Sequence, residues 1–290
     1  MDISNKMKIN DQLLINSPAP LSSSIRNSLS SFLKNKSLIY KFSKREIIGK
    51  YRGSIFGIGW SILQPLFMLT IYTFIFSKIL KVQWTNSATG AKESFPLFAF
   101  SGMIILNFFS DTIIRSTTAL PTNSNYVKKT MFPIDILGWT TVISSYFHLL
   151  IGILLLLIAE LIIKRSIPLT AIISPFYFIP TFIMLIGLSW ILMSAGAYIK
   201  DLSQAVPIAT TILSFTAPVF YPLESVPASL RAYIYLNPLT LPIEQFREIT
   251  LSKSTLNTGY FLVYTVIAFI IFKLGYVIFQ KSRKGFADVL

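Results

Sequence analysis

The sequence has no cysteine, one histidine and 12 acidic residues in 290 positions. Without cysteine the chain can form no disulfide, thiolate metal site or thiol nucleophile. It also lacks the G-x-x-x-x-G-K-[ST] loop that binds ATP, a His cluster and a nucleophile elbow. These absences argue against an enzyme and predict no catalytic residue, metal or cofactor in this chain.

Charge is also scarce, at 13% of residues, whereas 53% are hydrophobic and the mean hydropathy is +0.62. A soluble domain cannot bury that much apolar surface, so the sequence predicts an all-α integral membrane protein. The formal net charge of +14 could suggest nucleic acid. The cations lie at the edges of apolar runs, however, which is typical of membrane topology and excludes nucleic acid as the expected partner.

The first thirty residues lack the apolar run of a signal peptide. Residues 1–33 are therefore predicted to form a flexible cytoplasmic tail, and residues 34–290 a six-span membrane domain. A span needs about 20 mostly apolar residues. Six windows qualify: Gly57 to Ile79, Leu97 to Leu120, Ile134 to Ile163, Leu169 to Ile199, Leu202 to Tyr221, and Tyr260 to Phe279.

The distribution of Lys and Arg predicts the orientation of these spans. With the N-terminus inside, 17 of these cations fall on the cytoplasmic side and 8 on the other, and Lys273 lies in the last span. Both termini are therefore predicted to be cytoplasmic. Between spans five and six, Pro222 to Lys253 is too polar to span. Pro227 and Pro238 each suit the first turn of a short helix, which predicts a helix pair re-entering the outer leaflet.

A basic stripe precedes the first span. As a helix, the segment places Lys34, Lys41, Arg45 and Arg52 within about 40° of one another. Gly49 and Gly53, further along the same segment, allow a bend. The stripe is typical of plain positive-inside anchoring, but it could also dock an anionic lipid head group or a partner subunit.

Charged residues within the spans are functional suspects. Asp111 and Arg115 are spaced i, i+4, which favours a local ion pair. Glu160 and Lys273 lie near span ends and are expected to snorkel toward the interface. His148 is interpreted as a hydrogen-bonded helix residue, since no proton path accompanies it.

At this point the sequence resembles a known family, the membrane subunits of ABC-2-type exporters of lipid-linked polysaccharides (O-antigen, capsule and teichoic acid). The resemblance is carried by "REIIGKYRGSIFGIGWSILQPLFMLTIYTFIFSKILKV", by "YVKKTMFPIDIL", by the segment from "YIKDLSQAVP" to "IEQFRE", and by the ending "GFADVL". Where the family usually has Asp near the first motif, this chain has Glu46. The resemblance implies a homodimer in the cytoplasmic (inner) membrane with two ATP-binding cassette subunits, which would bind the ATP and Mg.

The resemblance also implies roles for particular residues. An undecaprenyl-type lipid-linked glycan would meet its head-group site at Arg45, Lys50 and Arg52. Aromatic residues, which otherwise form interfacial belts, could line a channel at Trp60, Phe67, Tyr72, Phe220 and Tyr221. Coupling to the ATPase is assigned to Glu46, Tyr126, Lys128, Lys129 and Phe132. The outer gate is assigned to Pro218, Pro222, Pro227, Arg231, Asn237 and Pro238.

The residues leave three alternative functions open. One is an exporter of small molecules or lipids from the same superfamily. Another is an ion-coupled flippase without an ATPase, which the few buried carboxylates and the lack of visible repeats disfavour. A membrane-embedded glycosyltransferase is the most distant, because no suitable Asp pair is seen.

Overall fold

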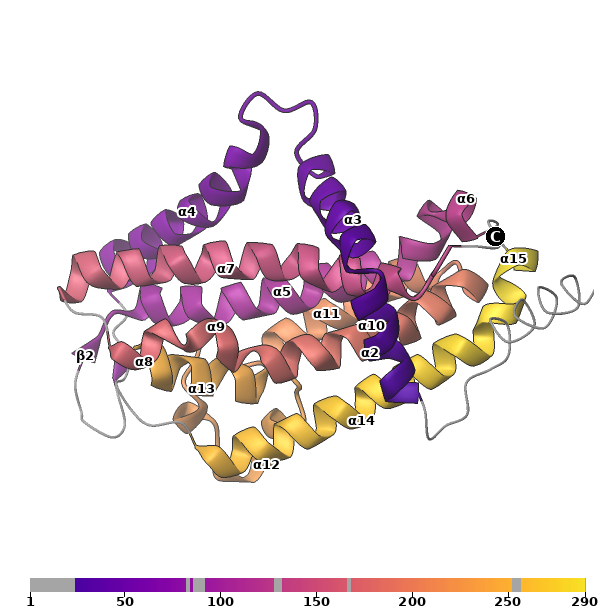
Figure 1. Ribbon diagram of the computed structural model, residues 1–290. Helices are drawn as coiled ribbons and strands as arrows, with labels where there is room; N and C mark the ends of the chain where they lie inside the picture. Colours follow the sequence, from indigo (N-terminus) through magenta and orange to yellow (C-terminus); the bar gives the residue numbers. More distant parts are fainter. Residues whose placement is uncertain are drawn as a thin grey trace, which may run out of the picture.

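The computed structural model describes residues 24–81, 84–85, 92–127, 132–165, 168–251 and 257–289. Apart from one two-residue antiparallel pair, β1 (Trp84–Thr85) with β2 (Lys92–Glu93), the described elements are helices. Long helices lie roughly along one another and form an elongated bundle (Figure 1). The chain is thus an all-helical membrane protein, as its composition predicts.

Five helical stretches of the described chain are long and apolar enough to cross a membrane: Gly57–Ile79, Phe95–Thr122, Ile136–Lys164, Ile179–Tyr198 and Thr258–Gly285. The first contains η2 (Gly57–Gly59), α4 (Trp60–Tyr72) and the π-helical η3 (Thr73–Ile79). The next three are α5 (Phe95–Thr122), α7 (Ile136–Lys164) and α10 (Ile179–Tyr198). The last contains α14 (Thr258–Ser282) and η5 (Arg283–Gly285).

Shorter helices complete the fold. Before the bundle lie α2 (Ser24–Lys34) and α3 (Lys36–Gly49). Between the long helices lie α6 (Ser124–Val127), α8 (Leu169–Ile172), α9 (Ser174–Tyr177), α11 (Leu202–Thr216), η4 (Leu223–Ser225), α12 (Ala228–Tyr235) and α13 (Thr240–Thr250). The last helix is α15 (Phe286–Val289). In Figure 1, α6 and α15 mark one end of the bundle, here called the α15 end, and α12 marks the other, the α12 end.

Two predicted spans have different bounds in the structure. The predicted window from Leu169 to Ile199 is broken into α8, α9 and α10, because Pro175 and Pro180 each begin a new helix. The window from Leu202 to Tyr221 is helical only as far as Thr216. Ala217 is extended, as expected for a residue that precedes proline.

The region before the bundle also differs from the predicted flexible tail of residues 1–33, because part of it is helical. α2 crosses the predicted tail boundary at residue 33 and packs against α14. The predicted bend is present: α3 ends at Gly49, and Gly53 has a φ of +86°, which favours glycine. Residues 50–59, here called the elbow, lead to α4, and α3, the elbow and α4 rise from one side of the bundle (Figure 1).

The interior of the bundle depends on close backbone approach. α10 packs against α14 and α5, and α5 packs against α7. At Gly187 of α10, an added Cβ would lie 2.5 Å from the Ile271 carbonyl oxygen and 2.6 Å from the Phe272 Cα. Gly275 faces Gly187 from α14 in the same contact. Small residues at such crossings let membrane helices approach closely.

Gly187→Ala should therefore separate α10 from α14 and lower stability by about 1–3 kcal/mol, the usual cost of overpacking. The measurement is the thermal midpoint of the detergent-purified protein, followed by size-exclusion fluorescence. Gly49→Ala is the matched control, because an added Cβ there meets nothing within 4 Å. Equal midpoints for the two variants would contradict this packing.

Candidate functional site

Four charged side chains join α3 and the elbow to α5. Arg115 Nη2 donates to Glu46 Oε2, and Arg115 Nη1 lies 3.3 Å from Asp111 Oδ2. Asp111 Oδ1 in turn accepts from Lys50 Nζ at 3.2 Å. The local Asp111–Arg115 pair predicted from the sequence is thus confirmed. It is the centre of a longer chain, Glu46–Arg115–Asp111–Lys50, here called the charge network.

Hydroxyl groups on α7 hold the charge network in place. Ser145 Oγ donates to Asp111 Oδ2 at 2.7 Å, and Ser144 Oγ accepts from Arg115 at 3.2 Å. The four charged side chains are 19–41% exposed, so they are neither fully hydrated nor fully buried. Burial raises the pKa of the Glu46 carboxyl above its usual value, and the Arg115 guanidinium opposes that rise. The network therefore links α3, α5 and α7 through partners that depend on one another.

A second contact joins α3 to the segment after α5. Arg45 Nη1 donates to Tyr126 Oη at 2.9 Å, and its guanidinium lies 4.2 Å from the ring centroid of Phe42. The rings of Phe42, Tyr126 and Phe132 are 5.0–5.4 Å apart by centroid. This aromatic cluster brings together residues predicted for two roles, since Arg45 was assigned to the head group and Tyr126 and Phe132 to coupling.

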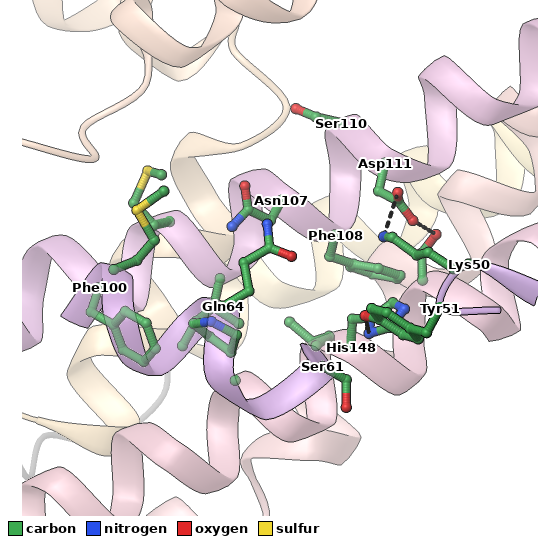
Figure 2. Close-up of a pocket in the computed structure, with 17 residues that line it drawn as sticks. Lys50, Tyr51, Ser61, Gln64, Phe100, Asn107, Phe108, Ser110, Asp111 and His148 are labelled. Atoms are coloured by element: carbon green, nitrogen blue, oxygen red, sulfur yellow. Dashed lines mark hydrogen bonds and ion pairs between the residues drawn. The ribbon is translucent and has the colours of Figure 1, made fainter. Parts of the chain in front are cut away.

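The charge network borders an open cavity of about 260 Å³ among the elbow, α4, α5 and α7. Figure 2 shows Lys50, Asp111, Tyr51 and His148 gathered at one end and Phe100 at the other. Gln64 and Asn107 line the wall between them. Tyr51 Oη lies 3.4 Å from His148 Nδ1, which agrees with the prediction that His148 is hydrogen-bonded. This space is here called the elbow cavity.

At the α12 end, one buried arginine holds three backbone segments together. Arg247 of α13 is 2% exposed. Its guanidinium donates to the carbonyl oxygens of Phe98 at 2.9 Å, Pro218 at 2.6 Å and Val219 at 2.8 Å. It also lies 3.0 Å from Glu244 Oε1. Arg247 thus ties α13 to α5 and to the backbone where α11 stops.

Asn237 also binds the end of α11, through hydrogen bonds to its last turn. Its Nδ2 donates to the Leu213 carbonyl and to Thr216 Oγ1, both at 2.9 Å, while its Oδ1 accepts from the Leu239 N–H at the start of α13. Buried backbone groups without partners cost about 1–3 kcal/mol each. Arg247 and Asn237 together therefore allow α11 to end inside the protein.

The other residues predicted for the outer gate lie close by. Pro227 precedes α12, and Arg231 donates to the carbonyl oxygens of Val226 and Glu224 at 2.9 and 2.7 Å. Pro222 precedes η4, and the Pro238 carbonyl accepts from Tyr264 Oη at 3.5 Å. The two short helices predicted after span five are present as α12 and α13.

The predicted channel aromatics fall into separate places. Tyr72 and Phe220 are in contact, with ring centroids 6.0 Å apart, and Phe76 lies beside both. Phe67 is exposed on α4, and Trp60 contacts Phe56 near the elbow. Tyr221 Oη donates to the Thr216 carbonyl at 2.9 Å. The Tyr72–Phe220 contact connects α4 to the segment after α11.

One sequence prediction is wrong, and two of the predicted residues lie outside the described ranges. Glu160 does not snorkel: it is fully buried, with its Oε1 3.6 Å from Lys164 Nζ. Lys128 and Lys129 lie outside the described residues, and Arg52 is exposed on the elbow. Arg247 is a site residue that none of the sequence predictions includes. Its position four residues after Ile243 on a short apolar face was a signal that it is buried.

No group of three or more His, Asp or Glu side chains within the described ranges could hold a metal ion. The chemistry that these sites offer is ion pairing, hydrogen bonding and aromatic contact. They are therefore suited to binding and to transmitting movement between helices.

Arg247→Lys should lower the thermal midpoint by several degrees, because one ammonium cannot reach the three carbonyls that the planar guanidinium binds. Arg231→Lys is the matched control, since Arg231 also binds backbone carbonyls but at a more exposed position. Size-exclusion fluorescence of both purified variants makes the comparison. An Arg247→Lys midpoint within about 1 °C of wild type would contradict the role of Arg247.

The charge network can be tested by a double-mutant cycle of Glu46→Gln, Arg115→Gln and both together. We expect a coupling free energy of about 1 kcal/mol or more, because the pair is partly buried and Arg115 also contacts Asp111. The free energy of unfolding is measured by detergent titration. Additive effects of the two single substitutions would mean that the contact contributes nothing to stability.

Comparisons with known proteins identify the family of this chain. The family model described as "ABC-2 type transporter" matches residues 37–251. The chain is 27% identical over 255 residues to the O-antigen export system permease protein RfbA of Klebsiella pneumoniae, covering 87% of this chain and 95% of the relative. It is 20% identical to the protein of that name from Myxococcus xanthus, with the same coverage. It is 27% identical over 262 residues to the polysialic acid transport protein KpsM of Escherichia coli, covering 83% and 93%. The chain belongs to the ABC-2 type transporter family.

Proposed function

We propose that this chain is the membrane-spanning subunit of an ABC transporter that exports a lipid-linked polysaccharide across the cytoplasmic membrane. A separate subunit would bind and hydrolyse the ATP. The observation that carries the proposal is the family match over residues 37–251, together with relatives named for O-antigen export and polysialic acid transport. This chain covers 93–95% of the length of those relatives, so the likeness extends through the membrane domain.

α11 would be the sixth span. It has 15 residues, about 22 Å of helix, which is shorter than the ~30 Å hydrocarbon core. Irregular backbone at membrane depth is tolerated where protein buries it, and Ala217, Pro218 and Val219 are buried. Six spans would leave both termini on one side, and the excess of Lys and Arg assigns that side to the cytoplasm. α12 and α13 would then re-enter the membrane from outside.

A second copy would cover the exposed edge of the bundle. The most apolar window of Gly57–Ile79 has no buried residue, whereas 72% of the window in α5 is buried. On α11, Ile208, Ile212 and Phe215 are 60–76% exposed. We place the glycan channel of a homodimer between α4 and α11 of its two protomers. The contact of Tyr72 with Phe220 supports a path that ends beneath α12 and α13.

Coupling to the ATPase would act through α3 and the segment around α6. The Arg45–Tyr126 hydrogen bond attaches α3 to α6, and the charge network attaches α3 to α5. A partner that moves α3 would therefore move both α5 and the elbow. Lys128 and Lys129 remain proposed contacts for this partner.

The three cations proposed for the head group differ in their contacts. Arg45 and Lys50 already have partners, whereas Arg52 lies exposed at the elbow. Arg52 is thus the best-placed cation for a pyrophosphate, which its planar fork could bind bidentately.

Arg52→Ala should reduce surface polysaccharide several-fold without disturbing assembly with the ATPase, because a charge-assisted hydrogen bond to phosphate is lost. Lys44→Ala, which removes an exposed cation from α3, is the control. Surface glycan is measured by immunoblot and assembly by co-purification. Wild-type export by Arg52→Ala would count against the head-group role.

The proposed function itself is tested by co-expressing the chain with its neighbouring ATPase candidate. A complex of two membrane and two ATPase subunits, whose ATP turnover responds to added lipid-linked glycan, is the expected result. A chain that purifies alone and moves substrate on an ion gradient would refute the proposal.

A further inference from the structure

The elbow cavity contains two amide side chains that the fold leaves without partners. Gln64 on α4 and Asn107 near the middle of α5 are both exposed, although both belong to membrane-spanning helices. The part of the chain that the structure describes offers neither amide a hydrogen-bond partner. Uncovered amides are costly in lipid, so polar groups at this depth usually face water or a ligand.

The size of the elbow cavity limits what it can hold. Its volume of about 260 Å³ is just below the ~300–1,000 Å³ that is usual for small-molecule pockets. It therefore has room for one ring-sized group and not for a polymer or a long lipid chain. Its position beside the exposed side of α4 places it at the edge of the proposed channel.

The charges around the elbow cavity balance. Lys50 and Arg115 are matched by Asp111 and Glu46 in one continuous network. A phosphate would meet no net positive charge here, and the Asp111 carboxylate would repel it. A hydroxyl-rich group is better matched, since each hydroxyl both donates and accepts.

The polar groups that line the elbow cavity include both hydrogen-bond donors and acceptors. Each of the two amides carries an NH₂ donor and a carbonyl acceptor. Lys50 adds N–H donors. Figure 2 shows these groups on successive parts of the wall, leading from Phe100 toward the elbow.

We propose that the elbow cavity is a sugar-binding subsite that holds one unit of the transported glycan through Gln64 and Asn107. This inference rests on the proposed function and adds to it a place of direct glycan recognition within each protomer. Hydrogen bonding in this subsite favours hydroxylated rings and excludes the lipid and its phosphate.

The test uses the complete complex with its ATPase in nanodiscs. The probe is the water-soluble oligosaccharide released by mild acid from the lipid-linked glycan of the host strain, and binding is measured by saturation-transfer NMR. Gln64→Leu, Asn107→Leu and the double variant each remove the amides without leaving an empty space at the position. Gln280→Leu is the matched control, because it makes the same change at a half-buried position of α14, outside the cavity and on neither helix of the proposed channel.

The expected result is a loss of affinity of about tenfold or more in the double variant, with smaller losses in the single variants and none in Gln280→Leu. Surface export should fall in the same order. Co-purification with the ATPase shows that each variant is folded, and the single variants serve if the double variant is not. Unchanged binding by assembled variants would overturn the subsite.

Two further outcomes are distinguishable. Tighter binding of a polyprenyl phosphate without sugar, lost at high salt, would assign the cavity to phosphate and overturn the sugar assignment. If wild-type complex exports glycan but the double variant exports and binds normally, only the subsite fails. If wild-type complex neither exports glycan nor responds to it, the proposed function fails and the subsite with it.

Discussion

The arrangement of the α12 end depends on the buried guanidinium of Arg247. It donates hydrogen bonds to backbone carbonyls that have no partner within a helix. α11 stops at Thr216, and the carbonyls of Pro218 and Val219 are bound by Arg247, which also binds the Phe98 carbonyl in α5. In a membrane, water is not available to replace those bonds. The end of α11 at Thr216 therefore depends on the packing of α13, which carries Arg247. The backbone that Arg247 holds leads directly to Phe220, which contacts Tyr72.

α5 connects this end of the protein to the other. It binds Arg247 through Phe98 near its start, and it carries Asp111 and Arg115 of the charge network further along. Phe98 and Asp111 are about 20 Å apart along the helix axis, by the rise of an α-helix. Because most of its apolar window is buried, α5 can act as a rigid link. In the proposed transporter, a movement of α3 by the ATPase would reach the α12 end through this helix.

Local patterns in the sequence were sufficient for much of this fold. Hydropathy predicts the spans, prolines predict α12 and α13, and the i, i+4 spacing predicts the Asp111–Arg115 pair. The contacts that organise the sites are between distant residues: Arg115 with Glu46 is 69 positions apart, and Arg247 with Phe98 is 149. No local period reveals such partners. The same limit explains Glu160, whose burial depends on neighbouring helices, and the early end of α11, where a proline outweighs hydropathy.

We have proposed that this chain moves a lipid-linked polysaccharide with ATP hydrolysed by a partner. The most direct measurement is transport in proteoliposomes that contain the purified complex and lipid-linked glycan, with glycan on the far side detected by an impermeant lectin. We expect accumulation that requires ATP and persists when ionophores remove all ion gradients. Accumulation without ATP, driven by an imposed gradient, would contradict it.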